Sequence, residues 1–195
     1  RDVSGTLGLG LTTGIRGDSH ANGTIIGGAT DTAGTGPGNV INASQRGFSS
    51  GEGISISFGI NNCVIQGNLI GTDVTGTSAL GFTRNGVEVF GASNTIDSNI
   101  IAGAGQQGIL LGHDTDLVHD NLIHFNYIGT DTTGTRLLGN SNGVLAQFSR
   151  NNTISGNVIA HNSGAGVAVA SGVTGLSVLG NSIFSNGGLG IDLLG

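Results

Sequence analysis

The densest group of titratable side chains lies between residues 113 and 124. Its members are His113, Asp114, Asp116, His119, Asp120 and His124. Imidazole and carboxylate groups that lie together can bind a metal ion or transfer protons in general acid–base catalysis. Asp114 and Asp116 are two residues apart, so both would point to one face of a strand. We favour a simpler interpretation, a polar corner in an enlarged repeat, and keep the catalytic or metal site as the alternative.

A second set of polar residues belongs to a loop motif, Gly-Thr-Asp-x-Thr-Gly-Thr, at 71–77 and 129–135, with a looser copy at 29–35. Its candidate ligand-binding residues are Thr72, Asp73, Thr75, Thr77, Thr130, Asp131, Thr133 and Thr135. Polar, glycine-rich inserts of this kind predict loops that leave the body of the protein along one ridge. In repeat proteins such a ridge is often the binding face.

Asp73 and Asp131 are weak candidates for calcium ligands, since each loop offers one carboxylate beside threonine and backbone oxygens. The other interpretation is that each aspartate accepts hydrogen bonds from its own turn. Two repeats of separation, about 10 Å, is too far for both carboxylates to bind one ion at about 2.3–2.6 Å. We therefore expect no cofactor, with calcium as the alternative.

The elements that position these side chains follow from a repeated phrase, Asn-x-Ile. Its copies begin at Asn39, Asn68, Asn99, Asn126, Asn157 and Asn181, and a phrase Gly-[Ile/Val]-x-apolar follows each one. Steps of 24 to 31 residues indicate a solenoid, in which each coil buries its apolar face only against its neighbours. The asparagines predict a ladder of stacked amides, because an amide both donates and accepts hydrogen bonds.

Alternation of apolar and small polar residues predicts three short strands in each coil, for example at 152–154, 157–160 and 166–169. We therefore expect an all-β protein, a parallel β-helix of about six or seven coils that forms one domain over residues 1–195. Because the chain contains no methionine, we expect a processed subunit or a fragment of a longer protein.

The composition narrows the choice of partners and location. The chain has no lysine and a net charge of −6, which argues against nucleic acid and against anionic membrane surfaces. No stretch approaches the roughly 20 apolar residues of a membrane span. The lone Cys63 cannot form an internal disulfide. Few charges and many Asn, Thr, Ser and Gly residues predict a secreted, extracellular or cell-surface protein.

Four segments, at 68–81, 126–139, 152–169 and 180–193, resemble the right-handed parallel β-helix repeats of secreted bacterial surface proteins, within the pectate-lyase-like superfold. The resemblance implies a right-handed coil and a surface, adhesive or structural role. Enzymes of that superfold are lyases, hydrolases or epimerases. Of the motif set of its polygalacturonases this chain shares only Gly112-His113, and it lacks the lysine of that set. We therefore expect no enzymatic activity.

Two functions are compatible with these features. Apolar, strand-like segments at 7–11 and 190–195 predict uncapped ends that pair between copies. We therefore expect a non-enzymatic structural protein, a subunit or segment of an extracellular filament, surface fibre or adhesin. The alternative is a carbohydrate-binding or carbohydrate-active β-helix that acts on a cell-surface or matrix polysaccharide through the polar cluster at 113–124. A groove lined by aromatic side chains would favour this second function.

Overall fold

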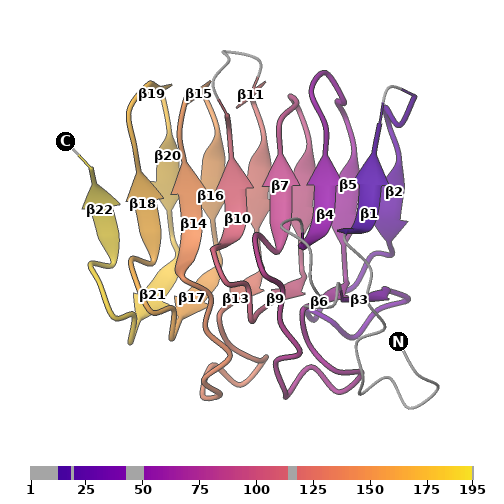
Figure 1. The fold of residues 1–195 in the computed structure, drawn as a ribbon, viewed down its shortest axis with the longest axis vertical. Helices are drawn as coiled ribbons and strands as arrows, with labels where there is room; N and C mark the ends of the chain where they lie inside the picture. The colour runs from indigo at the N-terminus through magenta and orange to yellow at the C-terminus, as the bar shows by residue number, and fades with distance from the viewer. Residues whose placement is uncertain (1–12, 19, 43–50, 114–117, 195) are drawn as a thin grey trace.

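The computed structural model describes residues 13–18, 20–42, 51–113 and 118–194. In these residues the chain winds into a rod of stacked coils, and Figure 1 shows the strands in order from β1 to β22. Asp114, Asp116 and the segment 7–11 lie outside the described residues, so the roles predicted for them stay predictions. The described part of the chain contains no helix long and apolar enough to span a bilayer.

Three parallel sheets run along the rod. Sheet A consists of β1 (Thr13–Gly17), β4 (Glu52–Ile56), β7 (Val87–Val89), β10 (Gln107–Leu111), β14 (Asn142–Ala146), β18 (Val167–Val169) and β22 (Ile191–Leu193). Sheet B consists of β2 (Ile25–Gly27), β5 (Val64–Gln66), β8 (Thr95–Asp97), β12 (Leu122–His124), β16 (Thr153–Ser155) and β20 (Ser177–Leu179). Sheet C consists of β3 (Val40–Ile41), β6 (Leu69–Ile70), β9 (Ile100–Ile101), β13 (Tyr127–Ile128), β17 (Val158–Ala160) and β21 (Ser182–Phe184).

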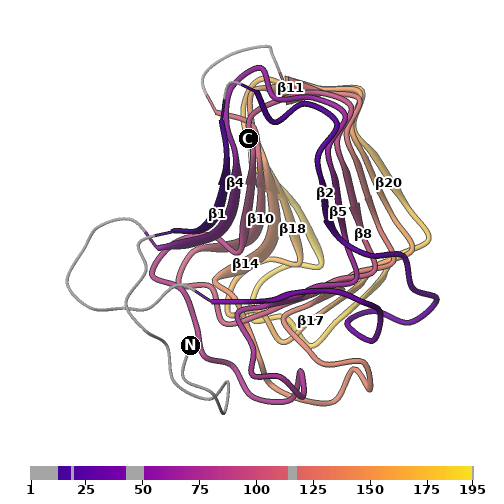
Figure 2. The ribbon, with the colours of Figure 1, turned by 90° about the vertical axis from the view of Figure 1, so that its right-hand side faces the viewer.

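Each coil passes through sheets A, B and C in that order, and six such coils precede β22 in the described residues. A parallel connection of this kind is right-handed, so the fold is a right-handed parallel β-helix, seen along its axis in Figure 2. The predicted fold class, with three strands in each of six or seven coils, is confirmed. A short sheet D between sheets A and B was not predicted. It consists of β11 (Val118–His119), β15 (Ser149–Arg150) and β19 (Val173–Thr174).

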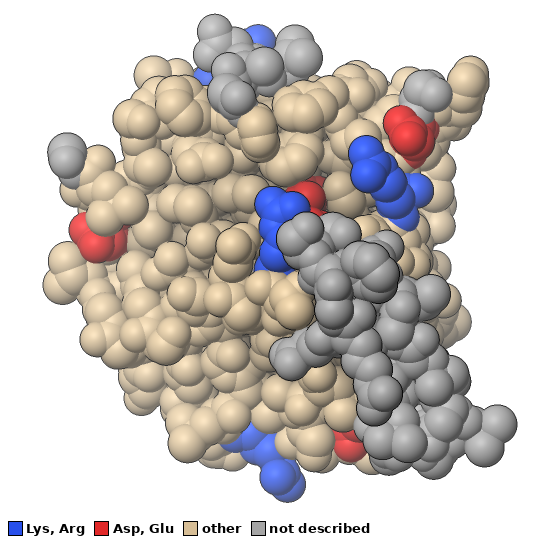
Figure 3. Space-filling model, in the orientation of Figure 1, with Lys and Arg blue, Asp and Glu red and all other residues tan. Residues whose placement is uncertain are grey.

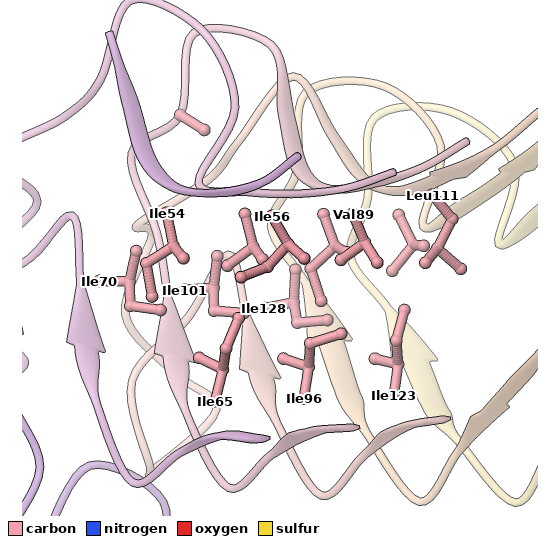
Figure 4. Packing of buried hydrophobic residues seen from close by; sticks show 14 of the residues in the cluster. Ile54, Ile56, Ile65, Ile70, Val89, Ile96, Ile101, Leu111, Ile123 and Ile128 are labelled. Carbon is pink, nitrogen blue, oxygen red and sulfur yellow. The ribbon is translucent and has the colours of Figure 1, made fainter. Parts of the chain in front are cut away.

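Rows of branched aliphatic side chains fill the interior of the rod (Figure 4). Ile65, Ile96 and Ile123 occupy the same register position on successive strands of sheet B, and all three are fully buried. β-Branched side chains suit these positions because their restricted rotamers pack well on a pleated strand. Each buried isoleucine stabilises the fold by about 1.5–3 kcal/mol. A one-residue slip would turn a whole row outward, so the rows also fix the register.

The asparagine ladder stands at the corner between sheets B and C. Its members are Asn39, Asn68, Asn99, Asn126, Asn157 and Asn181. The Oδ1 atom of Asn99 accepts hydrogen bonds from the backbone N–H of Asn68 at 2.9 Å and from its Nδ2 at 3.0 Å. Nδ2 of Asn99 donates to the carbonyl oxygen of Ile65 at 2.9 Å and to Oδ1 of Asn126 at 3.0 Å. Each amide therefore ties two neighbouring coils together.

Two further asparagine ladders, which the sequence analysis missed, occupy the other corners. One precedes sheet B and the other precedes sheet A; their members are Asn94, Asn121 and Asn152, and Asn140, Asn162 and Asn186. Cys63 takes the asparagine position in the coil before Asn94, and its backbone N–H donates to Oδ1 of Asn94 at 2.9 Å. All three corners of the rod are thus held by side-chain amides.

Candidate functional site

A groove of about 540 Å³ lies on the outside of the rod at the corner between sheets B and C. One wall is the loop 28–36 between β2 and β3, and the other wall is formed where the chain leaves β8 and β12. Residues from separate coils meet here, among them Asp31, Asp97, Phe125 and Gly156. The groove therefore extends along the rod across several coils.

The loop 28–36 is held against the outer face of sheet C. Ala33 is buried beside Leu69, and Tyr127 packs against the same small cluster. The backbone N–H of Gly34 donates to the carbonyl oxygen of Ser98 at 3.1 Å. A Cβ atom on Gly34 would lie 2.7 Å from the Leu69 side chain, so this close approach requires glycine. These contacts fix the loop as one wall of the groove.

Phe125 presents an exposed aromatic ring to the groove. It is 60% exposed and its backbone has a φ of 51°, and the equivalent corner of other coils is occupied by Gly67, Ser98 and Gly156, which also have positive φ. A left-handed backbone costs a phenylalanine roughly 1–2 kcal/mol. A Cβ atom on Gly156 would lie 2.8 Å from the Phe125 ring, so this glycine makes room for the ring. Phe148 is also exposed and also has a positive φ, so Phe125 is distinguished by its place in the wall of the groove.

The polar groups of the groove are carboxylates, hydroxyls and one imidazole. Oδ1 of Asp97 accepts a hydrogen bond from the Ser98 hydroxyl at 2.7 Å and lies 3.6 Å from Nε2 of His124. Asp31 is exposed in the opposite wall, and its carboxylate has no hydrogen bond or ion pair within the described residues. Neither arginine nor lysine is among the described residues that line the groove. Hydrogen-bonding oxygens therefore lie beside an aromatic surface.

The two close copies of the Gly-Thr-Asp loop follow β6 and β13, two coils apart as predicted. The looser copy at 29–35 follows β2 instead of a strand of sheet C and forms a wall of the groove. Its Gly34 and Gly76 of the copy at 71–77 both lie against the side chains of Leu69 and Ile100, so the two loops share the outer face of sheet C. Thr72 and Thr130 are fully buried, so neither can contact a ligand as predicted. The remaining threonines form two hydroxyl pairs, Thr75 with Thr77 at 2.7 Å and Thr133 with Thr135 at 2.6 Å.

The aspartates of these two loops accept hydrogen bonds from their own turns. Oδ1 of Asp73 accepts from the Thr75 hydroxyl at 2.9 Å and from the Thr77 backbone N–H at 3.1 Å. Asp131 is buried, and its Oδ1 accepts from the Thr133 hydroxyl at 2.7 Å. Burial alone would raise the pKa of both carboxyls, but the hydrogen bonds together outweigh burial and lower each pKa. This geometry matches the turn-capping interpretation rather than a calcium site.

The predicted histidine–aspartate cluster is dispersed over three sheets. His113 follows β10 of sheet A and packs edge-on against Phe90, with ring centroids 5.2 Å apart. His119 lies in β11 of sheet D, where its Nδ1 is 2.8 Å from Oδ2 of Asp120. Among the described members of the cluster, only His124 lines the groove. The chain turns corners between the first and last histidine, and this separates side chains that are close in sequence.

Sheet A carries a buried carboxylate pair that was not predicted from the sequence. On the surface, by contrast, charged side chains are sparse on the face of the rod shown in Figure 3. Glu52 in β4 and Glu88 in β7 are 5% and 4% exposed. Nη1 of Arg84 lies 2.9 Å from Glu52 and Nη2 lies 3.8 Å from Glu88. Burial raises the pKa of Glu88, while a hydrogen bond from Asn85 opposes the rise. A glutamate inside the apolar segment 86–89 is the signal that could have revealed this group.

The structure thus defines a right-handed parallel β-helix protein with a loop-walled groove on its outer surface. Residues 71–195 match the NosD family, described as a periplasmic copper-binding protein, and the chain belongs to this family. No curated protein matches the chain. The family description places its members in the periplasm, which agrees with the coarser part of the predicted location, outside the cytoplasm.

The described residues do not fit a copper centre. Copper sites use histidine, cysteine and methionine side chains gathered around the ion, and the chain has no methionine. Cys63 is buried, with its Sγ 3.1 Å from the carbonyl oxygen of Ala21. Among the described residues, no three His, Cys, Asp or Glu side chains are grouped so that they could hold a metal ion. The expectation of no cofactor stays a prediction.

Proposed function

We propose that this NosD-family chain is a non-enzymatic β-helix of the cell envelope that binds polysaccharide in the groove between the loop 28–36 and the corners of sheets B and C. The observation that carries the proposal is Phe125, a strained phenylalanine that is 60% exposed in the groove wall. Its position favours an aromatic platform for a ligand. The proposed function is thus the carbohydrate-binding alternative named above, with the groove as the binding site in place of the polar cluster at 113–124.

The chemistry of the groove supports a carbohydrate ligand. A sugar ring has apolar faces that stack on aromatic side chains and hydroxyls that need hydrogen-bonding partners at its edge. Phe125 and Tyr127 supply aromatic surface, while Asp31, Asp97 and Thr30 supply oxygens. Because the groove extends across several coils, it suits a chain of linked sugars better than a single small molecule.

We propose binding without cleavage, so that the resemblance to the pectate-lyase-like superfold extends to recognition only. Glycoside hydrolysis needs one carboxylic acid that burial keeps protonated and a second carboxylate opposite it. In the groove Asp31 is exposed and Asp97 is half-buried. Asp97 also accepts a hydrogen bond from Ser98. These surroundings suit carboxylates that orient a ligand, and they do not match those of a catalytic pair.

A second proposal is end-to-end assembly into a filament, surface fibre or adhesin, and it rests on the last described coil. Val167 in β18 is fully buried, but its register partner Ile191 in β22 is 46% exposed, and Leu193 is 74% exposed. A further parallel strand against β22 would cover both side chains and pair with the edge of β22 that has no partner strand among the described residues. We propose that a second copy supplies this strand. Sedimentation velocity tests it: concentration-dependent association that Leu193→Lys abolishes supports assembly, and a monomer at every concentration refutes it.

The groove proposal is tested by affinity electrophoresis against a panel of soluble polysaccharides, with Phe125→Ala compared against Phe148→Ala. Phe148 is a matched control: it is exposed, its φ is 42°, and its ring also lies over a glycine, Gly172. We expect Phe125→Ala to weaken binding at least about tenfold, equivalent to about 1.4 kcal/mol, with Phe148→Ala unchanged. Equal retention of both variants and the parent protein would refute the groove as the binding site.

A further inference from the structure

The charge pattern of the groove narrows the class of sugar, on the basis of the proposed function. We infer that the groove selects polysaccharides that carry protonated amino sugars over neutral glycans, and that it excludes uronate-rich glycans. Two carboxylates, Asp31 and Asp97, belong to opposite walls. The described lining residues include neither arginine nor lysine, and their one basic side chain is His124, whose Nε2 lies 3.6 Å from Oδ1 of Asp97. Net negative charge attracts an ammonium group and repels a uronate.

The position of Asp97 suits an ammonium ligand. Its Oδ1 already accepts a hydrogen bond from the Ser98 hydroxyl at 2.7 Å, which orients the carboxylate. Oδ2 has no hydrogen bond within the described residues, and the side chain is 23% exposed. A charge-assisted hydrogen bond from a sugar ammonium to a half-buried carboxylate is stronger than one from a neutral hydroxyl. Asp97 is therefore the main anchor for the amine.

Asp31 and the aromatic residues complete the recognition. Asp31 is exposed without an ion-pair partner in the described part of the chain, so it can turn toward a bound cation. Phe125 and Tyr127 border the same space, and an ammonium group near an aromatic face is attracted by the ring. A neutral sugar would also stack on the rings, but its hydroxyls would form weaker hydrogen bonds to the two carboxylates than an ammonium group would.

Calorimetric titration with three probes tests this inference: glucosamine oligosaccharides, their N-acetylated counterparts of equal length, and oligogalacturonate. We expect the amine form to bind about tenfold more tightly than the N-acetylated form, and this advantage to shrink at high salt. Asp97→Asn should remove most of the advantage and Asp31→Asn part of it, because each variant should weaken binding of the amine form much more than binding of the N-acetylated form. Asp192→Asn, on the outer face of β22 and outside the groove, is the control.

The outcomes distinguish a failure of the amino-sugar inference from a failure of the proposed carbohydrate binding. Equal affinity for amine and N-acetylated probes, or an advantage that survives Asp97→Asn, would overturn the amino-sugar inference and leave carbohydrate binding intact. Tight binding of oligogalacturonate would overturn it in the same way. Failure of all three probes and of the wider polysaccharide panel would overturn the proposed function itself.

Discussion

The fully buried Asn99 offers the sharpest test of how the rod is held together. Its Oδ1 accepts two hydrogen bonds from Asn68. Its Nδ2 lies 2.9–3.0 Å from three acceptors, the carbonyl oxygens of Ile65 and Asp97 and Oδ1 of Asn126. An amide has only two N–H groups, so Asn99→Ala removes the equivalent of about four full hydrogen bonds. At about 0.5–1.5 kcal/mol each, the loss is about 2–6 kcal/mol.

Urea unfolding followed by far-UV circular dichroism measures this loss. Asn181→Ala, at the half-buried last described rung of the same ladder, removes three hydrogen bonds and should cost less. Asn99→Asp keeps the shape and one acceptor but loses the donors, so we expect it to be as destabilising as alanine. If Asn99→Ala costs under about 1 kcal/mol, or no more than Asn181→Ala, the ladder does not stabilise the rod as described.

Two further predictions concern the acidic groups. Because burial raises the folded-state pKa of Glu88, its contribution to stability is full below its ordinary pKa of 4.5 and is lost as pH rises through the folded value. In melting experiments from pH 4 to 8, the stability of Glu88→Gln should therefore increase relative to that of the parent as pH rises. Melting temperatures that change with pH in the same way for both proteins would contradict this. Since Asp73 and Asp131 already cap their own turns, we expect millimolar calcium to leave the melting temperature unchanged; a rise that Asp73→Asn abolishes would show an ion site.

Much of the fold could be predicted from the sequence, because every coil needs the same types of residue at its corners and in its interior. The phrase Asn-x-Ile combines a corner amide with an inward isoleucine, and it located the first ladder. The same phrase also occurs at Asn94, Asn121 and Asn152, so the second ladder is also marked in the sequence. Sheet D carried less signal, since a segment such as Ser149–Arg150 lacks the apolar alternation of a strand.

The groove could not be predicted in the same way, because its residues come from different coils. Asp31 and Asp97 belong to opposite walls and are far apart in sequence. Only the superposition of coils brings them to one corner. The histidine cluster failed for the opposite reason: residues adjacent in sequence pass around corners and end on different sheets. In a β-helix, a surface site is formed mainly by residues that lie side by side on different coils, and less by residues that are adjacent in sequence.

The most direct test of carbohydrate binding uses a reporter that the chain already contains. Tyr127 is the one tyrosine of the sequence, which has no tryptophan, and it lines the groove. Intrinsic tyrosine fluorescence therefore reports on this site alone. We predict a saturable change on titration with glucosamine oligosaccharides that is retained in Phe148→Ala and strongly weakened in Phe125→Ala. Unchanged fluorescence despite binding measured by calorimetry would place the sugar elsewhere on the rod and contradict the assignment.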